Sequence, residues 1–461
     1  MKAIIVGGGK VGDLLCEELS QTFDEVTLIE INEKLAQKII ELYDIQGIVG
    51  SGANYNVLDE ADAAKADLFI AVTASDEINI LSCITAKQMG AKYTIARVRN
   101  PEYTQTKEFL KHHLGIDLML NPEFEAAKQI NFMLKYPSAN KIETFGQNKV
   151  KMIEVTIREN SILKDKSLIE SKNIINFPAV VCLVERKEEV IVPRGDYTFK
   201  VGDKVHITAD DVNLKKFYKL LGEKENVDKK IRSTLIIGSG KLSYYLIELL
   251  KMNNIYIKNI EIDPKKADKI SDTFPDIDVI LADGSDRDVL IEEGIQTFDS
   301  CIALTGLDEE NIIISLYANK LGVKKSIAKI NRNSLTQIAE DIGLYSFITP
   351  KRIVGDIIAK HSKSLQCSSE PSIENIYRIA NNKVELMEFK VLKETKLTNT
   401  PLKDLKINEN ILIGFIIRNN NLIFPSGDDD IRKDDNVIII NYQQNIKELD
   451  DILNTEVYYE L

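Results

Sequence analysis

The sequence has few of the residues that build metal and redox sites. Its 461 residues include only four histidines and five cysteines. No two cysteines have the Cys-x-x-Cys spacing, and no two histidines have the His-x-x-x-His spacing of common metal motifs. We therefore expect no metal site, and we interpret the cysteines as small buried side chains in a reducing compartment. The residues concerned are His112, His113, His206, His361, Cys16, Cys83, Cys182, Cys301 and Cys367.

The sequence also lacks an excess of basic residues and any long apolar run. Its 59 Lys and Arg residues are outnumbered by 71 Asp and Glu residues, which gives a net charge of −12. This charge argues against nucleic acid and anionic lipid as partners, because both attract basic surfaces. No apolar run approaches the roughly 20 residues that cross a bilayer, and residues 3–6 are typical of a strand rather than of a signal peptide. We expect a cytoplasmic protein with no direct membrane insertion.

A glycine-rich turn occurs twice in the sequence. The first copy lies in residues 1–12 and the second in residues 233–243, and their first glycines are 231 positions apart. In each copy the turn follows a predicted strand and opens a predicted helix, which is the setting of the G-x-G-x-x-G nucleotide motif. The motif positions are filled by Gly7, Gly9 and Gly12 in the first copy and by Gly238, Gly240 and Ser243 in the second.

Strands and helices alternate around both copies, which predicts parallel sheets built from right-handed βαβ units. In the first half, strands are predicted at residues 3–6, 26–30, 67–73 and 94–98, and helices at residues 10–20 and 77–89. An amphipathic helix follows each sheet, near residues 123–135 and 352–365, and β-type runs at residues 151–157 and 386–391 then open two small domains.

The predicted fold class is therefore α/β, with tandem Rossmann-like domains that each precede a small α+β domain. The Rossmann-like domains are placed at residues 1–136 and 231–366 and the small domains at residues 141–226 and 373–458, with a polar linker near residues 222–230. Because each half carries an apolar helix that is expected to be exposed, we predict assembly of at least two chains.

The first glycine turn has the residues that a dinucleotide site needs. Gly7 permits the tight turn, Gly9 lets the backbone approach a pyrophosphate, and Gly12 lets the helix pack close to the strand. The helix N-terminus offers backbone N–H groups to phosphates. Glu30 lies 18 residues after Gly12, at the end of the second predicted strand, where an acid accepts hydrogen bonds from ribose hydroxyls.

Further polar residues are predicted at the carboxyl edge of each sheet. We expect Arg97 and Arg99 to contact phosphate. For Lys10 and Lys241 two roles stay open: contact with a phosphate of their own pocket or of a neighbouring subunit, or a place on the solvated surface. Asp76 is a candidate helix cap, although its segment recurs more fully than capping requires. The recurring positions are Thr73, Asp76, Glu77, Asn79, Arg97 and Arg99 in the first half and Thr305, Asp308, Glu309, Asn311, Lys329 and Asn331 in the second.

The second copy departs from the motif at one position. Ser243 adds a hydroxymethyl group where the helix meets the strand, which makes close packing harder and leaves open a decayed second pocket. Glu261 keeps the position of the ribose-binding acid. Gly52 and Gly284, the latter preceded by Asp283, are expected to shape the loop over the ribose.

Together these residues resemble the RCK family of nucleotide-binding domains, also called KTN. The resemblance rests on the glycine turns, on Glu30 and Gly52, and on residues 71–79 and 96–100. Two such domains in tandem, each with a small β-rich C-terminal domain, resemble the TrkA family of regulatory subunits of bacterial Trk potassium uptake systems. The resemblance covers essentially the whole chain.

The resemblance implies a non-enzymatic subunit that binds NAD or NADH, with ATP or ADP as competing ligands. It also implies a homo-oligomeric ring of RCK domains, from dimer to tetramer, on the inner face of the plasma membrane, where ligand exchange gates a potassium transporter of the TrkH type. The helices near residues 123–135 and 352–365 resemble the family's swapped dimerisation helices. The implied binding residues are Gly7, Gly8, Gly9, Lys10, Val11, Gly12, Glu30, Gly52, Thr73, Arg97, Gly238, Ser239, Gly240, Lys241, Glu261, Asp283 and Thr305.

Two other functions are compatible with a repeated nucleotide motif. A nicotinamide-dependent dehydrogenase needs an acid or base near the nicotinamide, and the nearest candidates, His112 and His113, lie in a polar segment that favours a solvated helix face. A scaffold with two inactive pockets predicts no nucleotide binding. We favour the nucleotide sensor because no catalytic residues follow either turn.

Overall fold

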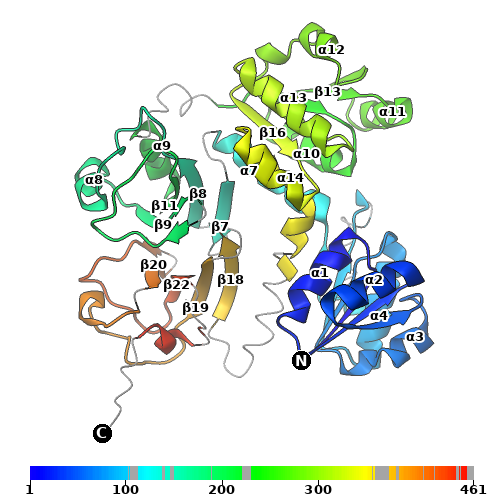
Figure 1. Cartoon of the computed structure of the whole chain (residues 1–461), viewed down its shortest axis with the longest axis horizontal. Coiled ribbons are helices and arrows are strands. Elements are labelled where there is room, and N and C mark those ends of the chain that lie inside the picture. The colour runs from blue at the N-terminus through cyan, green and yellow to red at the C-terminus, as the bar shows by residue number, and fades with distance from the viewer. Residues whose placement is uncertain are drawn as a thin grey trace. The chain divides into compact units, whose positions relative to one another are not determined.

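The computed structural model shows two compact units, and each unit takes one segment from each half of the sequence (Figure 1). The first unit comprises residues 1–131 and 232–366, and the second comprises residues 132–231 and 367–461. The structure describes residues 1–101, 103, 113–137, 141–145, 150–187, 189–220, 230–355, 357–358, 373–379, 384–408, 410–419, 421–442, 446 and 448–453.

The first unit contains two parallel sheets, as predicted, and each sheet has six strands. The first sheet has the order β3-β2-β1-β4-β5-β6 and the second has the equivalent order β14-β13-β12-β15-β16-β17. The strands of the first sheet are β1 (Lys2–Val6), β2 (Glu25–Glu30), β3 (Gln46–Val49), β4 (Leu68–Ala71), β5 (Tyr93–Arg97) and β6 (Leu118–Leu120). Those of the second are β12 (Ser233–Ile237), β13 (Tyr256–Glu261), β14 (Asp278–Leu281), β15 (Ser300–Ala303), β16 (Lys325–Lys329) and β17 (Phe347–Ile348).

Helices connect the strands and cover the sheets. In the first half they are α1 (Lys10–Ser20), α2 (Glu33–Tyr43), α3 (Tyr55–Glu60), η1 (Ala63–Lys65), α4 (Asp76–Met89) and α7 (Pro122–Lys135). In the second half they are α10 (Lys241–Lys251), α11 (Pro264–Thr273), α12 (Arg287–Glu292), η2 (Ile295–Thr297), α13 (Asp308–Lys320) and α14 (Asn333–Asp341). Successive residues of β1 point to opposite faces of the first sheet. Ile4 and Ile5, for example, are both fully buried but belong to two different core clusters, one on each face.

The sequence identifies the central strands of the first sheet but not its edges. The side chains of edge strand β3 are exposed or partly exposed, and β6 has only three residues. Neither strand therefore has the continuous apolar run that marks a buried parallel strand.

The two Rossmann-like domains exchange their last helices within the chain. Helix α7 lies beside α10 of the second Rossmann-like domain (Figure 1). At the start of α7, Asn121 Nδ2 donates to Tyr245 Oη of α10 at 2.8 Å, and the Phe124 ring lies edge-on to the Tyr245 ring at 5.4 Å. In the opposite direction, the last helix of the second half comprises residues 350–355 and 357–358 among those described. Its Val354 and Ile358 belong to a core cluster formed by α1 and the first sheet. The resemblance to swapped helices is thus realised between the two halves of one chain.

The exchange also covers the apolar helix faces that the sequence analysis expects to be exposed. Ile130 and Ile358 are fully buried, and Met133, Leu134 and Ile353 are buried as well. The prediction of exposed helices is therefore wrong, because residues of the same chain cover them. Residues 359–365 of the second predicted helix lie outside the described residues. Self-association needs a different surface.

The second unit contains two antiparallel sheets of five strands each. Their orders are β10-β9-β11-β8-β7 and β18-β19-β22-β20-β21. The first comprises β7 (Lys141–Phe145), β8 (Val150–Thr156), β9 (Val180–Arg186), β10 (Glu189–Ile191) and β11 (Lys204–Ala209), with α8 (Leu168–Ile174) and α9 (Asp211–Leu220). The second comprises β18 (Ile373–Ile379), β19 (Val384–Lys390), β20 (Ile411–Arg418), β21 (Asn421–Ile423) and β22 (Asn436–Tyr442), with η3 (Leu402–Asp404) and η4 (Leu449–Ile452).

Each small sheet begins one strand earlier than the β-type runs that were predicted to open it. The predicted runs correspond to β8 and β19, and these pair with the preceding strands β7 and β18. A shared apolar cluster, which includes Met152 and Leu183 of the first sheet and Leu386 and Phe415 of the second, joins the two sheets.

Candidate functional site

The predicted binding residues gather where the first parallel sheet reverses its strand order. β1 lies between β2 and β4, and ligands of doubly wound sheets bind outside the carboxyl ends of the strands at such a point. A cavity of about 780 Å³ lies at these strand ends. The predicted site residues that line it are Gly7, Gly9, Lys10, Val11, Glu30, Gly52, Thr73 and Arg97 from the first half and Gly240 and Lys241 from the second.

Both halves of the chain contribute to this cavity. Lys329, Asn331 and Lys351 of the second half line it together with the first glycine turn. Other predicted site residues lie outside its described lining, and these are Gly8, Gly12, Gly238, Ser239, Glu261, Asp283 and Thr305. The sequence thus predicts the strand ends that form the cavity, and the exchange of helices brings the two sets together.

The first glycine turn has no room for side chains at two of its three motif positions. Gly7 has a φ of +102°, which L-residues rarely adopt. A Cβ atom on Gly12 would lie 1.8 Å from the Gly7 carbonyl oxygen. A Cβ atom on Gly9 would meet no atom within 4 Å, and Gly9 caps α1 with an extended backbone. The turn is therefore tight against the helix and open toward the cavity.

The acid at the end of the second strand is fixed beside the turn in both halves. Glu30 accepts hydrogen bonds from the backbone N–H groups of Gly8 at 2.5 Å and Asn32 at 2.9 Å. Glu261 accepts the equivalent bonds from Ser239 and Asp263 at the same distances. These bonds place each carboxylate at the strand end, where we predict that it accepts ribose hydroxyls.

The recurring Thr-x-x-Asp-Glu-x-Asn segment holds the loops at the strand ends together. Asn79 Oδ1 accepts from the Thr73 backbone N–H at 2.7 Å, and its Nδ2 donates to the Arg97 carbonyl at 2.8 Å. In the second half, Asn311 makes the corresponding bonds to Thr305 at 2.8 Å and Lys329 at 2.9 Å. The buried asparagine thus links the loops after two neighbouring strands in each half.

Asp76 does not cap the helix that follows it. The cap of α4 is Ser75, whose side chain accepts from the Ile78 N–H. The buried Asp76 carboxylate instead accepts the backbone N–H groups of Arg99 at 2.9 Å and Asn100 at 2.8 Å. The capping alternative is therefore wrong, and this role in the loop after β5 explains why the residue recurs as Asp308.

The two arginines after β5 have different surroundings. Arg99 pairs with Asp76 at 3.7 Å and donates to the Ala74 carbonyl. Arg97 lines the cavity and donates from Nη2 to the Thr73 carbonyl at 2.5 Å, while its buried Nε has no hydrogen-bond partner among the described residues. Burial lowers the pKa of Arg97, and the charge of Arg99 acts in the same direction. Arg99 Nε likewise lacks a hydrogen-bond partner among the described residues, but Arg99 is not part of the described cavity lining. Arg97 is therefore the better placed of the two for an anionic ligand.

Two lysines from the second half add positive charge to the cavity lining. Burial lowers the pKa of Lys329, whose Nζ donates to the Leu304 carbonyl at 3.2 Å. Burial also lowers the pKa of Lys351, and repulsion from Lys10 contributes to the same shift. Burial away from water disfavours the charged forms of both lysines, and repulsion from Lys10 adds to this effect at Lys351. A bound anion offsets both effects.

The second glycine turn accommodates Ser243 by forming a new hydrogen bond. Ser243 is fully buried, and its Oγ donates to the Gly238 carbonyl at 2.7 Å. Ser239 Oγ bonds to Asn259 Oδ1 at 2.6 Å, and Asn259 Nδ2 donates to the Gly238 carbonyl at 3.2 Å. The serine side chains of this turn thus bond to the Gly238 carbonyl and to Asn259 of β13, whereas the corresponding positions of the first turn, Gly8 and Gly12, are glycines without side chains. Whether the second turn binds a ligand stays a prediction.

Gly52 and Gly284, which lie in the loops after β3 and β14, are needed for close packing. A Cβ atom on Gly52 would lie 2.2 Å from the Val6 side chain, and one on Gly284 would lie 2.4 Å from that of Ile237. The exposed Asp283 accepts from the backbone N–H and Oγ of Ser285 in a local turn. These contacts shape the loop, and its predicted place beside a ribose stays a prediction.

Comparison with known families agrees with this arrangement over most of the chain. The TrkA-N domain matches residues 3–122 and 234–350, and the TrkA-C domain matches residues 152–222 and 386–454. The chain belongs to the TrkA family. The predicted family and the predicted tandem fold are thereby confirmed.

TrkA relatives match over almost their full lengths. The Trk system potassium uptake protein TrkA homolog of Archaeoglobus fulgidus is 29% identical over 452 residues, which are 98% of this chain and 100% of that protein. TrkA homolog 1 of Methanosarcina mazei is 31% identical over 449 residues, 96% of this chain and 97% of its own. TrkA of Haemophilus influenzae is 26% identical over the whole of both chains.

Solved structures share the fold at low sequence identity. The GsuK channel has a TM-score of 0.62 and 15% identity, and the match covers 96% of this chain and 77% of that one. The GsuK channel bound to NAD has a TM-score of 0.61 and 15% identity, with 98% of this chain and 78% of that chain covered. At this identity the likeness shows the fold alone.

Membership of the TrkA family favours a regulatory subunit of potassium transport over a dehydrogenase. The dehydrogenase hypothesis relied on two histidines, of which His112 lies outside the described residues and His113 is exposed. Among the described residues, no helix is both long and apolar enough to cross a membrane.

The cysteines are buried, as predicted, wherever the structure describes them. Cys16, Cys83, Cys182 and Cys301 are all fully buried, and burial raises the pKa of the Cys16, Cys182 and Cys301 thiols to about 12. Such thiols are unreactive at neutral pH. Cys367 lies outside the described residues.

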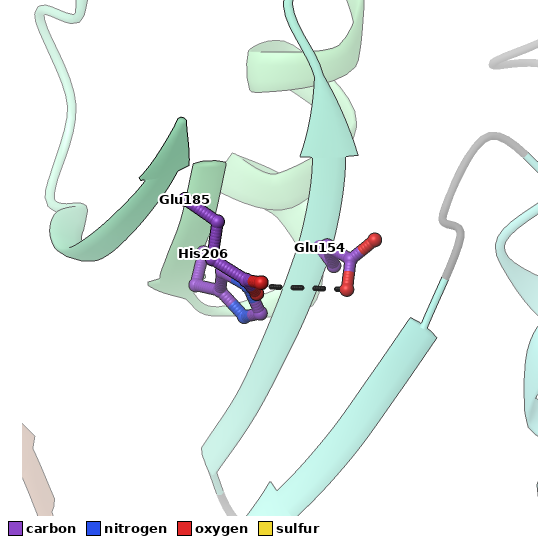
Figure 2. A group of neighbouring side chains, drawn as sticks. All are labelled: Glu154, Glu185 and His206. Carbon is purple, nitrogen blue, oxygen red and sulfur yellow. Dashed lines mark hydrogen bonds and ion pairs between the residues drawn. The ribbon is translucent and has the colours of Figure 1, made fainter. Parts of the chain in front are cut away.

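One polar cluster has no signal in the spacing of the sequence. Glu154, Glu185 and His206 come from three strands of the first small sheet and meet within 4.8 Å of one another (Figure 2). Sequence spacing reveals metal motifs within one element, and this group is assembled only by strand pairing.

Proposed function

We propose that this TrkA protein is a nucleotide-responsive regulatory subunit that controls a membrane potassium transporter of the TrkH type. The observation that carries the proposal is the cavity at the carboxyl ends of the first sheet, which combines an open glycine turn with cationic side chains from both halves. Family membership supports the role in potassium uptake, and the cavity supports the chemistry of the ligand.

The residues of the cavity suit a ligand with two or more phosphates and a ribose. The open space at Gly9 and the N-terminus of α1 favour close approach of phosphate oxygens. The buried Arg97 Nε supplies a hydrogen-bond donor that lacks a partner among the described residues, and Glu30 supplies acceptors for ribose hydroxyls.

We propose NAD or NADH in this cavity, with ATP or ADP as competing ligands. A fold shared with a GsuK channel that is bound to NAD supports the dinucleotide. Lys10, Lys241 and Lys351 supply positive charge that favours ligands with additional phosphates. In the second half, the proposed binding residues are Gly238, Ser239, Gly240, Lys241, Glu261, Asp283 and Thr305.

Regulation follows if the ligands differ in their affinity for two arrangements of the first unit. Because the cavity is lined by both Rossmann-like domains, a ligand that contacts both halves stabilises the arrangement that keeps them together. We further propose a homo-oligomeric ring of such units, held at the inner face of the plasma membrane by the transporter.

The test is thermal unfolding of the purified chain with NAD, NADH, ATP and ADP, for wild type, Gly9→Asp and Gly9→Ala. A ligand at 100 times its Kd stabilises the wild type by about 2.7 kcal/mol. Gly9 has φ −65° and free space around its Cβ position, so both variants fit the backbone. We expect Gly9→Asp to remove the shift by repelling phosphate and Gly9→Ala to retain most of it.

Three results would contradict the proposal. Equal ligand shifts in wild type and Gly9→Asp would show that the nucleotide binds elsewhere. No shift with any of the four nucleotides would favour the scaffold hypothesis. Turnover of NADH with a small substrate would instead return the dehydrogenase.

A further inference from the structure

Glu154, Glu185 and His206 form a compact group on one face of the first small sheet. His206 Nε2 lies 2.7 Å from Glu185 Oε1 and 3.8 Å from Glu154 Oε2. Figure 2 shows the three side chains directed toward one another from neighbouring strands. Glu154 and His206 are buried and Glu185 is nearly so.

Strand pairing fixes this group without help from loops. His206 lies in the middle of β11 and is the direct partner of Glu154 on β8. Glu185 lies on β9, paired with Lys204, two residues before His206 on the same face of β11. The three side chains that carry the ligand atoms therefore come from three adjacent, hydrogen-bonded strands. Such paired strands are the rigid setting that a metal site requires.

The second small domain provides an internal comparison. His206 lies three residues after the buried Asp203 and pairs with Glu154. In the second domain, Ile438 lies three residues after the buried Asp435 and pairs with Glu388, so Glu388 corresponds to Glu154. At the positions of His206 and Glu185 the second domain has Ile438 and Ile417. The same sheet thus forms without the histidine and the second acid, so the fold itself does not require the group.

We propose that Glu154, Glu185 and His206 bind a first-row divalent cation such as Zn²⁺ or Mn²⁺. One imidazole nitrogen with two carboxylates is a ligand set that suits these ions, whereas Ca²⁺ takes six to eight oxygen ligands. In a tetrahedral zinc site the ligand atoms are about 3.4 Å apart, given metal–ligand bonds of about 2.1 Å. The observed separations of 2.7 and 3.8 Å bracket this value.

The position of the group links the cation to the packing of the second unit. Met152 and Leu183, which share the sheet face of His206, belong to the apolar cluster that contains Leu386 and Phe415 of the second small domain. A cation that holds β8, β9 and β11 together therefore stabilises the surface on which the two small domains meet. The site is separate from the proposed nucleotide cavity and its occupancy does not depend on that proposal.

The test is a metal titration of the full chain, stripped with a chelator and measured without nucleotide. Zn²⁺ is titrated in competition with a chromophoric chelator, and Mn²⁺ by the loss of its free-ion electron paramagnetic resonance signal. The variants are His206→Gln and Glu185→Gln, and the matched control is Glu388→Gln, which changes the equivalent acid of the second small domain. Circular dichroism checks that each variant is folded.

We expect one equivalent of cation to bind wild type and Glu388→Gln with equal affinity. Loss of a ligand weakens binding at least about tenfold in His206→Gln and Glu185→Gln. The visible spectrum of bound Co²⁺ gives a second readout, which changes in His206→Gln because the imidazole is lost. No binding, or equal binding by all four proteins, would overturn the proposal and leave a histidine–glutamate hydrogen bond.

Discussion

At the scale of single residues, the two glycine turns solve one packing problem in two ways. At the third motif position Gly12 leaves no space for a side chain beside the Gly7 carbonyl. In the second turn Ser243 occupies the equivalent position and donates to the Gly238 carbonyl at 2.7 Å. The departure from the motif is therefore accommodated locally, and the second turn is an intact structure rather than a collapsed one.

This difference predicts that alanine at the two positions affects nucleotide binding differently, although both substitutions lower stability. Gly12→Ala places a Cβ atom 1.8 Å from a backbone oxygen, so the turn must shift, at a cost of about 1–3 kcal/mol. Ser243→Ala loses one hydrogen bond and costs about 1 kcal/mol. We expect Gly12→Ala to abolish the nucleotide-dependent thermal shift while Ser243→Ala retains the shift of the first cavity, measured by calorimetry with and without NAD. Equal nucleotide shifts in Gly12→Ala and wild type would contradict this account of the turn.

Residues that act within one turn could be predicted from the sequence, whereas those assembled by tertiary structure could not. Gly7 and Gly9 follow one predicted strand and Arg97 lies near the end of another, so their common edge is implied by parallel βαβ topology. Lys351 reaches the same cavity only through the exchange of helices. The Asp76 carboxylate accepts the backbone N–H groups of Arg99 and Asn100 in the loop after β5. This role could not be predicted because the loop follows a different strand from the one that precedes Asp76.

At the scale of elements, the exchanged helices are the main feature that the sequence suggests but does not place. Periodicity identifies an apolar face, and only the folded chain shows what covers it. The same limit applies to the ion pairs of the small domains. Arg186 and Asp203 bond at 2.7 Å through two atom pairs, and Arg418 and Asp435 repeat this pair in the second domain. Both pairs join a strand to a turn across 17 residues.

The exchange predicts that residues of the last helix stabilise the opposite domain. Ile358 is fully buried in the core cluster of the first Rossmann-like domain, so Ile358→Ala is expected to cost about 2–5 kcal/mol. Ile338 of α14 is 52% exposed, and Ile338→Ala is a matched control with an effect within about 0.5 kcal/mol. Hydrogen exchange should show faster exchange of α1 amides in Ile358→Ala alone. Unchanged protection of α1 would contradict packing of this helix within the chain.

At the scale of the whole molecule, the repeated halves present apolar side chains to solvent at matching positions. Val49 and Leu281 end the edge strands β3 and β14, and Leu81 and Ile313 occupy equivalent positions of α4 and α13. All four are exposed. Since the exchanged helices are covered within the chain, these positions are the better candidates for contacts between chains.

We therefore predict that assembly depends on the exposed positions of α4 and α13. The purified wild type should have a mass of at least two chains by light scattering, and the double variant Leu81→Asp/Ile313→Asp should dissociate at concentrations at least about tenfold higher, because a buried unpaired carboxylate opposes association. Met252→Asp is the control, since Met252 is 79% exposed but its counterpart in the first half is the polar Gln21. A monomeric wild type would contradict assembly itself. Unchanged dissociation of the double variant, with normal unfolding temperatures, would place the contact between chains on another surface and leave the ring proposal without these residues.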